Sequence, residues 1–157
     1  MDAALALPVE LLQRDGAAAS GASTLGGLRG DGVAVIDFWT TRCERCPEAL
    51  TKLDALAANL PAVKCAAVCL DDPDFAREII EEHGWANLTH ASMDAATKEL
   101  VKAALGFKQV PFIVVIRKDG SAAYRGSALT FSREKDLDPL LDAPKAAPVF
   151  CADDDDF

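Results

Sequence analysis

The sequence of 157 residues is poor in aromatic and in basic side chains. Aromatic residues make up 6% of it, and 16 lysines and arginines stand against 25 aspartates and glutamates, which leaves a net charge of −9 at pH 7. Because the phosphate backbone of a nucleic acid is bound by clustered lysine and arginine, this acidic composition argues against a nucleic-acid partner.

Long apolar runs are also missing. No run approaches the roughly 18 apolar residues that a membrane-spanning helix needs. The start, MDAALALPVELLQR, has no basic segment ahead of its apolar part, as a secretory signal would have. Half of the residues are nevertheless hydrophobic, 29 of them alanine, which is enough for the core of one domain. We therefore expect a soluble, cytoplasmic protein with no membrane partner.

The five cysteines are an odd number: Cys43, Cys46, Cys65, Cys69 and Cys151. An odd count without a signal peptide argues against a secreted domain held together by disulfides. In a reducing compartment, cysteines are usually buried small hydrophobes, metal ligands or redox groups, and these five are to be divided among those roles.

Apolar runs typical of buried strands alternate with segments of helical spacing along the chain. The expected elements are, in order, a helix over 3–14, a loop over 15–32, a strand over 33–39, a helix over 48–60, a strand over 63–70, a helix over about 73–83, a strand over 88–92, a helix over 94–105, a strand over 111–117, a turn at 119–120, a strand over 121–125 and a helix over about 132–141. This order predicts an α/β fold in which a mixed central sheet has helices on both faces and an antiparallel edge hairpin.

Three parts of the chain follow from this pattern. We expect an N-terminal extension over 1–22, one domain over 23–142 and an acidic C-terminal tail over 143–157. The tail is rich in proline and alanine and then acidic, so it cannot build a core. Its run Asp153 to Asp156 is interpreted either as a solubilising end or as a segment that docks on a basic surface.

The pair Cys43 and Cys46 lies directly after the first apolar strand and at the start of a helix. Unpaired N–H groups and the macrodipole at a helix N-terminus favour the thiolate form of the first cysteine. The second cysteine falls in the first turn, near enough to close a disulfide or to attack a mixed one. The pattern therefore predicts a pair that cycles between dithiol and disulfide.

A metal site is the alternative for a C-x-x-C pair. Zinc needs two further ligands, and Cys65 and Cys69 are about 13 Å apart if their strand rises ~3.3 Å per residue. They cannot pair with each other or hold one metal together, so we expect both to pack in the core. His83 and His90 have no partners at ligand spacing and are expected at the surface or at helix ends. We predict no metal and no cofactor.

Four segments in the same order and spacing resemble the thioredoxin superfamily. They are Ile36-Asp37-Phe38-Trp39, Cys43-x-x-Cys46, Val110-Pro111-Phe112 and Lys118-Asp119-Gly120. The resemblance covers roughly residues 23–142 and implies a thioredoxin-like fold. An added helix and strand over 73–92, together with Leu28-Arg29-Gly30, make the chain more similar to the TlpA and tryparedoxin branch.

The resemblance implies a role for each matching residue. Cys43 would be the exposed nucleophile and Cys46 the resolving thiol. Pro111 would follow a cis peptide bond beside the dithiol and present the backbone of Val110 to a partner chain. Asp37 would be a buried acid beneath the dithiol, which accepts a proton from Cys46 and has a pKa raised by desolvation.

The sequence departs from the family around the dithiol. Trp39 matches the family, but Arg42 stands where a tryptophan is usual directly before the first cysteine. Between the cysteines, Glu44 and Arg45 replace the common Gly-Pro. After the second cysteine, Pro47 replaces a residue that is commonly basic. The two arginines favour the Cys43 thiolate and Glu44 opposes it. Pro47 is tolerable only if its missing N–H is one that the helix leaves free. We expect a more polar face and a different choice of partner from that of a general thioredoxin.

Thr40-x-x-Cys43 bears a superficial likeness to the peroxidatic motif of peroxiredoxins. That family also expects proline before the threonine, where Ile36 stands in this sequence. Peroxide chemistry is therefore not predicted. Cys151, in the tail, is either inert or forms a mixed disulfide with Cys43 or with a neighbouring chain.

Two functions remain open. The first is dithiol–disulfide exchange with protein thiols and disulfides, either in a free-standing cytosolic oxidoreductase or in a tethered one. The second is a redox-sensing or non-catalytic subunit of a larger assembly. The mass, the alanine-rich composition and the Cys-Glu-Arg-Cys centre resemble the thioredoxin-related light chains of flagellar outer-arm dynein. That resemblance implies a dynein heavy chain and other axonemal subunits as partners and the axoneme as location.

Overall fold

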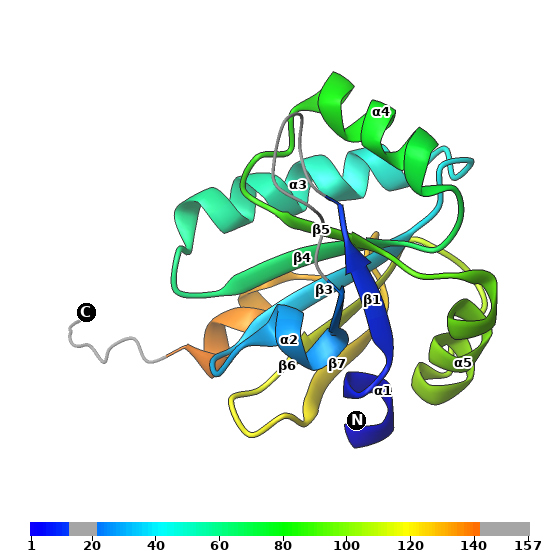
Figure 1. Ribbon diagram of the computed structural model, residues 1–157. Helices are drawn as coiled ribbons and strands as arrows, with labels where there is room; N and C mark the ends of the chain where they lie inside the picture. Colours follow the sequence, from blue (N-terminus) through cyan, green and yellow to red (C-terminus); the bar gives the residue numbers. More distant parts are fainter. Residues whose placement is uncertain (13–21, 142–157) are drawn as a thin grey trace, which may run out of the picture.

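A seven-stranded sheet runs through the computed structural model, which describes residues 1–12 and 22–141 (Figure 1). The strands lie side by side in the order β2 (Ala22–Thr24), β1 (Pro8–Leu11), β5 (Thr89–Ser92), β4 (Lys64–Cys69), β3 (Ala34–Trp39), β6 (Phe112–Ile116) and β7 (Ala122–Ser127). β3, β4 and β5 are parallel, whereas β6 is antiparallel to β3, β7 to β6, β1 to β5 and β2 to β1. The predicted mixed sheet with an antiparallel edge hairpin is confirmed.

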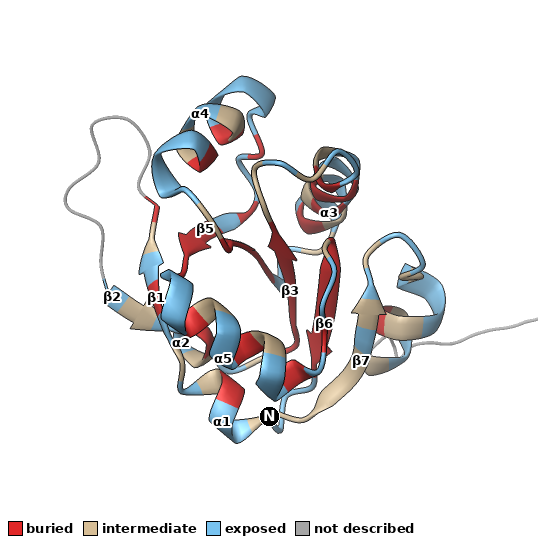
Figure 2. Ribbon diagram, turned by 90° about the vertical axis from the view of Figure 1, so that its right-hand side faces the viewer, coloured by how far each residue is buried: buried red, intermediate tan, exposed pale blue. Residues whose placement is uncertain are grey.

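Helices cover both faces of this sheet, as predicted. α3 (Cys46–Asn59) and α4 (Pro73–His83) lie on one face, and α1 (Asp2–Leu5), α2 (Leu25–Arg29) and α5 (Ala95–Leu105) lie on the other (Figures 1 and 2). α3 and α4 connect parallel neighbours, as crossover helices do. Among the residues that the structure describes, no helix is both long and apolar enough to pass through a membrane.

β3 is the centre of the core, and all six of its residues are buried (Figure 2). Because side chains alternate along a strand, Val35 and Trp39 pack in the layer beneath α3 and α4. Ile36 and Phe38 pack in the opposite layer. The carboxyl end of β3 leads directly into the turn that carries Cys43, so the core fixes the position of the dithiol.

The N-terminal segment differs from its prediction. A helix was expected over 3–14, but α1 ends at Leu5 and β1 begins at Pro8. Proline has no N–H for a helix interior, and as the first residue of a strand it costs no ladder bond. The expected loop over 15–32 contains β2 and α2, whose N-cap is the Thr24 hydroxyl, an acceptor for Gly27 N–H at 3.0 Å. Residues 13–21 lie outside the described part.

The final helix also differs from its prediction. Ser132 caps it as expected, but a π-helical turn over Arg133–Leu137 is followed by a 3₁₀ turn over Asp138–Leu140. Pro139 cannot donate the backbone bond that a continuous α-helix would need there. The predicted acidic tail lies outside the described residues.

Candidate redox site

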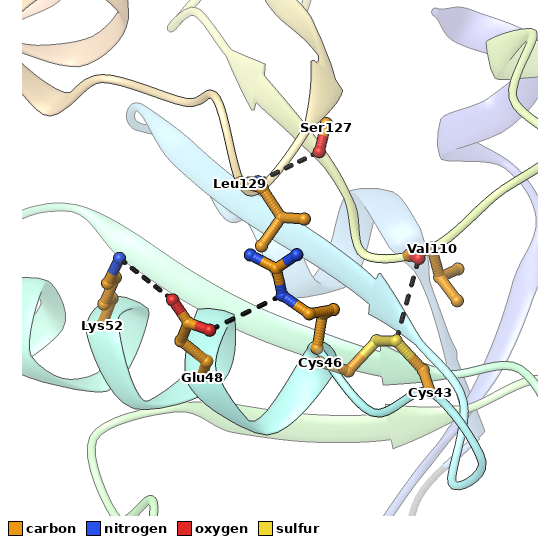
Figure 3. Close-up of polar contacts among 8 residues, drawn as sticks. Cys43, Cys46, Glu48, Lys52, Val110, Ser127 and Leu129 are labelled. Carbon is orange, nitrogen blue, oxygen red and sulfur yellow. Dashed lines mark hydrogen bonds and ion pairs between the residues drawn. A yellow bond between two sulfur atoms is a disulfide. The ribbon is translucent and has the colours of Figure 1, made fainter.

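Cys43 and Cys46 form a disulfide at the mouth of α3, with their Cα atoms 5.4 Å apart (Figure 3). Cys46 is the first residue of the helix and is fully buried, whereas Cys43 lies in the preceding turn and is partly exposed. Pro47 is the second helical residue, where an α-helix leaves the N–H without an acceptor, so the condition set for this proline is met. The pair is built so that one sulfur faces outward and the other is enclosed.

The charged residues around the disulfide are all exposed: Arg42, Glu44 and Arg45. Arg45 Nε lies 3.7 Å from Glu48 Oε1, and Lys52 Nζ lies 3.5 Å from Glu48 Oε2 (Figure 3). Surface ion pairs of this kind contribute little to stability. These ion pairs instead change the local charge, because Glu48 offsets part of the positive charge that Arg45 brings to the N-terminus of α3.

The loop before β6 lies against the outer sulfur. The Val110–Pro111 peptide bond is cis, and the Val110 carbonyl oxygen lies 3.7 Å from Cys43 Sγ (Figure 3). In the disulfide this sulfur carries no proton, whereas a reduced Cys43 thiol at that position can donate to the carbonyl. A backbone carbonyl and the partly exposed sulfur therefore lie next to each other.

Asp37 lies in the middle of β3 and is completely buried. Its strand neighbours are Ala67 and Ile113, and strand alternation places it on the same face as Trp39, towards α3 and Cys46. Neither carboxylate oxygen has a hydrogen-bond partner among the described residues. Desolvation in these apolar surroundings raises the pKa of Asp37 well above its usual value.

Trp39 shields this part of the core. It is 1% exposed, and its ring meets that of Trp85 edge to face, with centroids 6.0 Å apart. The Trp85 indole in turn donates to Thr51 Oγ1 at 3.0 Å. The two tryptophans thereby connect the end of β3 to α3.

Cys65 and Cys69 are buried on the same face of β4, as predicted for core residues. Burial raises the pKa of the Cys65 thiol to about 12 and also raises that of Cys69. Thiols in this state are poor nucleophiles. Cys151 lies outside the described residues, and within them no three His, Cys, Asp or Glu side chains form a group able to hold a metal ion.

The prediction for the two histidines is half wrong. His83 ends α4 and is exposed, with its ring stacked on Trp85 at 4.5 Å. His90, however, is buried, and its Nε2 lies 2.9 Å from the Trp85 carbonyl oxygen. β5 is an interior strand between β4 and β1. His90 pairs with Ala67 of β4, so its side chain lies on the same face of the sheet as that of Ala67, beneath α3 and α4.

Two residues at the site were not predicted. Asp71 accepts hydrogen bonds from Thr41, two positions before Cys43. Leu129, in the loop after β7, is 39% exposed and lines a pocket together with Ala49 and Lys52 of α3. Asp71 directly follows a buried strand, but only the pairing of β3 with β4 brings it to the dithiol turn.

The chain has a thioredoxin-like fold with a C-x-x-C disulfide, and the solved structures that share this fold include thiol–disulfide oxidoreductases. It is similar to DsbF of Mycobacterium tuberculosis, at 21% identity over 85% of this chain and 91% of that one, with a TM-score of 0.65. A secreted M. tuberculosis disulfide oxidoreductase homologous to E. coli DsbE gives 20% identity, coverage of 78% and 84%, and a TM-score of 0.62.

A thiol:disulfide interchange protein from Bacteroides sp. is similar as well, at 16% identity over 81% of this chain and 84% of that one, with a TM-score of 0.62. No protein-family model and no curated protein sequence matches the chain. At these identities the structural likeness establishes the fold, and the chemistry is argued from the site itself.

Proposed function

We propose that this chain carries out thiol–disulfide exchange with protein thiols and disulfides through Cys43 and Cys46. The observation that carries the proposal is the disulfide at the mouth of α3, in which Cys43 is partly exposed and Cys46 is buried. An exposed sulfur can reach a partner, and an enclosed one can complete the exchange without leaving the protein.

The exchange has two steps. In the reduced protein, the Cys43 thiolate attacks one sulfur of a client disulfide, and the other client sulfur leaves as a thiolate that takes up a proton. Cys46 then loses its proton and attacks Cys43 Sγ, which closes the protein disulfide and releases the second client thiol. The client gains two electrons and two protons, which the Cys43–Cys46 dithiol supplies; the reverse sequence oxidises a client dithiol.

Asp37 is the proposed proton acceptor for Cys46. The two residues lie in the same core layer beneath α3. Because burial raises the pKa of the Asp37 carboxyl, this pKa lies closer to that of a thiol than the pKa of an exposed carboxyl does, which favours proton transfer from Cys46. Val110 is the proposed client contact, because its carbonyl lies beside Cys43 and can pair with an extended client backbone.

The surface of this chain that a client would contact has both charged and apolar side chains. Arg42 and Arg45, on either side of Cys43 in the sequence, are exposed, and Leu129 offers an exposed apolar side chain beside Ala49 and Lys52 of α3. These features support a client whose cysteine is bordered by acidic and apolar residues, and a choice of partner that differs from that of a general thioredoxin.

A role as a subunit of a larger assembly is the second candidate. It is favoured by the residues that depart from the family at the dithiol and by the appended segment 143–157 with its own Cys151. The proposed link to flagellar outer-arm dynein, with a heavy chain as partner and the axoneme as location, rests on the sequence resemblance alone. A cytoplasmic location is likewise a proposal. Both candidates hold together if a tethered exchanger acts on nearby thiols at high effective concentration.

Reduction of insulin disulfides by dithiothreitol tests the exchange. The wild-type chain should accelerate precipitation of the insulin B chain, and Cys43→Ser should remove the acceleration because the attacking sulfur is lost. Cys65→Ser provides a matched control at a buried cysteine and should keep the activity. Equal rates for the wild type and Cys43→Ser would exclude exchange through this pair.

A further inference from the structure

The turn that carries Cys43 is tied to the end of a neighbouring strand by one carboxylate. The backbone N–H of Thr41 lies 3.0 Å from Asp71 Oδ1 and 3.1 Å from Oδ2, and the Thr41 hydroxyl donates to Oδ2 at 2.8 Å. The Cys69 thiol is a third donor, 3.0 Å from Asp71 Oδ1. The exchange steps proposed above give this carboxylate no part.

Asp71 is held on a rigid base. The preceding residue, Leu70, donates its N–H to the Trp39 carbonyl at 2.9 Å, which extends the pairing of β4 with β3. The following residue, Asp72, caps α4 by accepting two backbone N–H groups at 2.9 and 3.3 Å. Strand pairing on one side and a helix cap on the other leave the Asp71 backbone little freedom.

The dithiol turn itself is held more weakly. Its internal backbone bonds, Cys43 N–H to the Thr40 carbonyl and Cys46 N–H to the Cys43 carbonyl, are 3.3 and 3.4 Å long. The bonds to Asp71 are shorter and end on a carboxylate, and such charge-assisted bonds are the stronger kind. The carboxylate is therefore the main attachment of the turn to the sheet.

The buried thiol fixes the orientation of this carboxylate. Cys69 is fully buried, and burial together with the bond to Asp71 raises the pKa of its thiol, so it remains a protonated donor. It donates to Oδ1, the oxygen that Thr41 N–H also approaches most closely. Cys69 thereby keeps the carboxylate facing the turn.

We propose that Asp71 is a positioning residue that holds the Cys43 turn against the sheet and so keeps the two thiols of the reduced protein close together. The inference rests on the proposed exchange function and extends it. Formation of the disulfide depends on the effective concentration of one thiol at the other. If the turn is released, that concentration falls and the dithiol is favoured.

The equilibrium with glutathione measures this effect directly. The protein dithiol and oxidised glutathione give the protein disulfide and two reduced glutathiones, and alkylation with mass spectrometry gives the equilibrium constant. Asp71→Ala should lower that constant by about tenfold, a rise of about 30 mV in reduction potential. Thr41→Val should lower it by about threefold, because the backbone donor remains.

Two matched variants separate position from bulk charge. Thr41→Ser keeps the hydroxyl and should match the wild type. Asp72→Asn removes a neighbouring charge while keeping a side chain that can cap α4, and it should also match the wild type. A double variant of Thr41→Val and Asp71→Ala should differ no further from the wild type than Asp71→Ala does, because the same contact is already lost.

The inference is overturned if Asp71→Ala, folded by circular dichroism, has a constant within twofold of the wild type, or if Asp72→Asn shifts it as much. If Asp71→Ala does not fold, the Thr41 variants decide, and equal constants for Thr41→Val and Thr41→Ser overturn it. A wild-type chain that never forms the Cys43–Cys46 disulfide in this titration refutes the proposed function instead.

Discussion

Replacement of Asp37 by asparagine should change how stability depends on pH. The carboxyl is completely buried, and neither oxygen has a hydrogen-bond partner among the described residues, so its charged form is strongly disfavoured in the folded chain. Burial raises the pKa of Asp37 in the folded chain well above its ordinary value, which the unfolded chain keeps. Between these two pKa values the folded protein holds a proton that the unfolded protein has released.

The sign and size of the effect follow from proton linkage. Because the unfolded state binds fewer protons in this window, the free energy of unfolding falls as pH rises, by about 1.4 kcal/mol per pH unit for one group. The loss begins above the unfolded pKa, near 4, and ends once the pH passes the folded pKa. Over each pH unit between these two pKa values, the wild type therefore loses about 1.4 kcal/mol that the variant retains.

Urea unfolding of the oxidised protein at pH 5, 6, 7 and 8, followed by far-ultraviolet circular dichroism, provides the measurement. Asp37→Asn should be the more stable protein at neutral pH, and its advantage should shrink as the pH is lowered towards 5. Asp31→Asn, which removes an exposed carboxyl, is the matched control and should follow the wild type. Parallel pH profiles for the wild type and Asp37→Asn would refute the assignment of Asp37 as a buried, protonated acid.

Two further substitutions test the client surface and the helix ends. Leu129→Ser should lower kcat/KM for insulin reduction by about fivefold through the loss of apolar contact, with reduction of a small aromatic disulfide unchanged. Leu100→Ser on α5, also at an exposed leucine, should change neither, and equal losses for both substrates in Leu129→Ser would contradict a client contact. Gly106 ends α5 at φ 73°, so Gly106→Ala should cost about 1–2 kcal/mol in urea unfolding, whereas Gly32→Ala, which is not at positive φ, should not.

The central part of the fold could be predicted because its signals are local. The apolar runs at β3, β4 and β6 have no polar interruption apart from Asp37 and Lys64, and Gly84 and Gly106 end the helices between them in left-handed conformations. The C-x-x-C pair between β3 and α3 then predicts where the candidate redox site lies. Each of these features depends on neighbours in the sequence.

The features that could not be predicted depend on distant contacts. β1 forms because it pairs with the free edge of β5. The leucines in and around β1 are equally compatible with a helix, and Pro8 is the residue in the sequence that argues against one. His90 is buried because β1 covers that same edge. Asp71 reaches Thr41, 30 positions away, only because β3 and β4 end side by side.

Capture of a client sulfur by Cys46→Ser tests the central claim most directly. The reduced variant is mixed with a peptide that contains a single disulfide, and the adduct is located by proteolysis and mass spectrometry. We predict one stable mixed disulfide on Cys43, because the thiol that would release the peptide is gone. An adduct on Cys65, Cys69 or Cys151 in place of Cys43, or no adduct at all, would contradict the account.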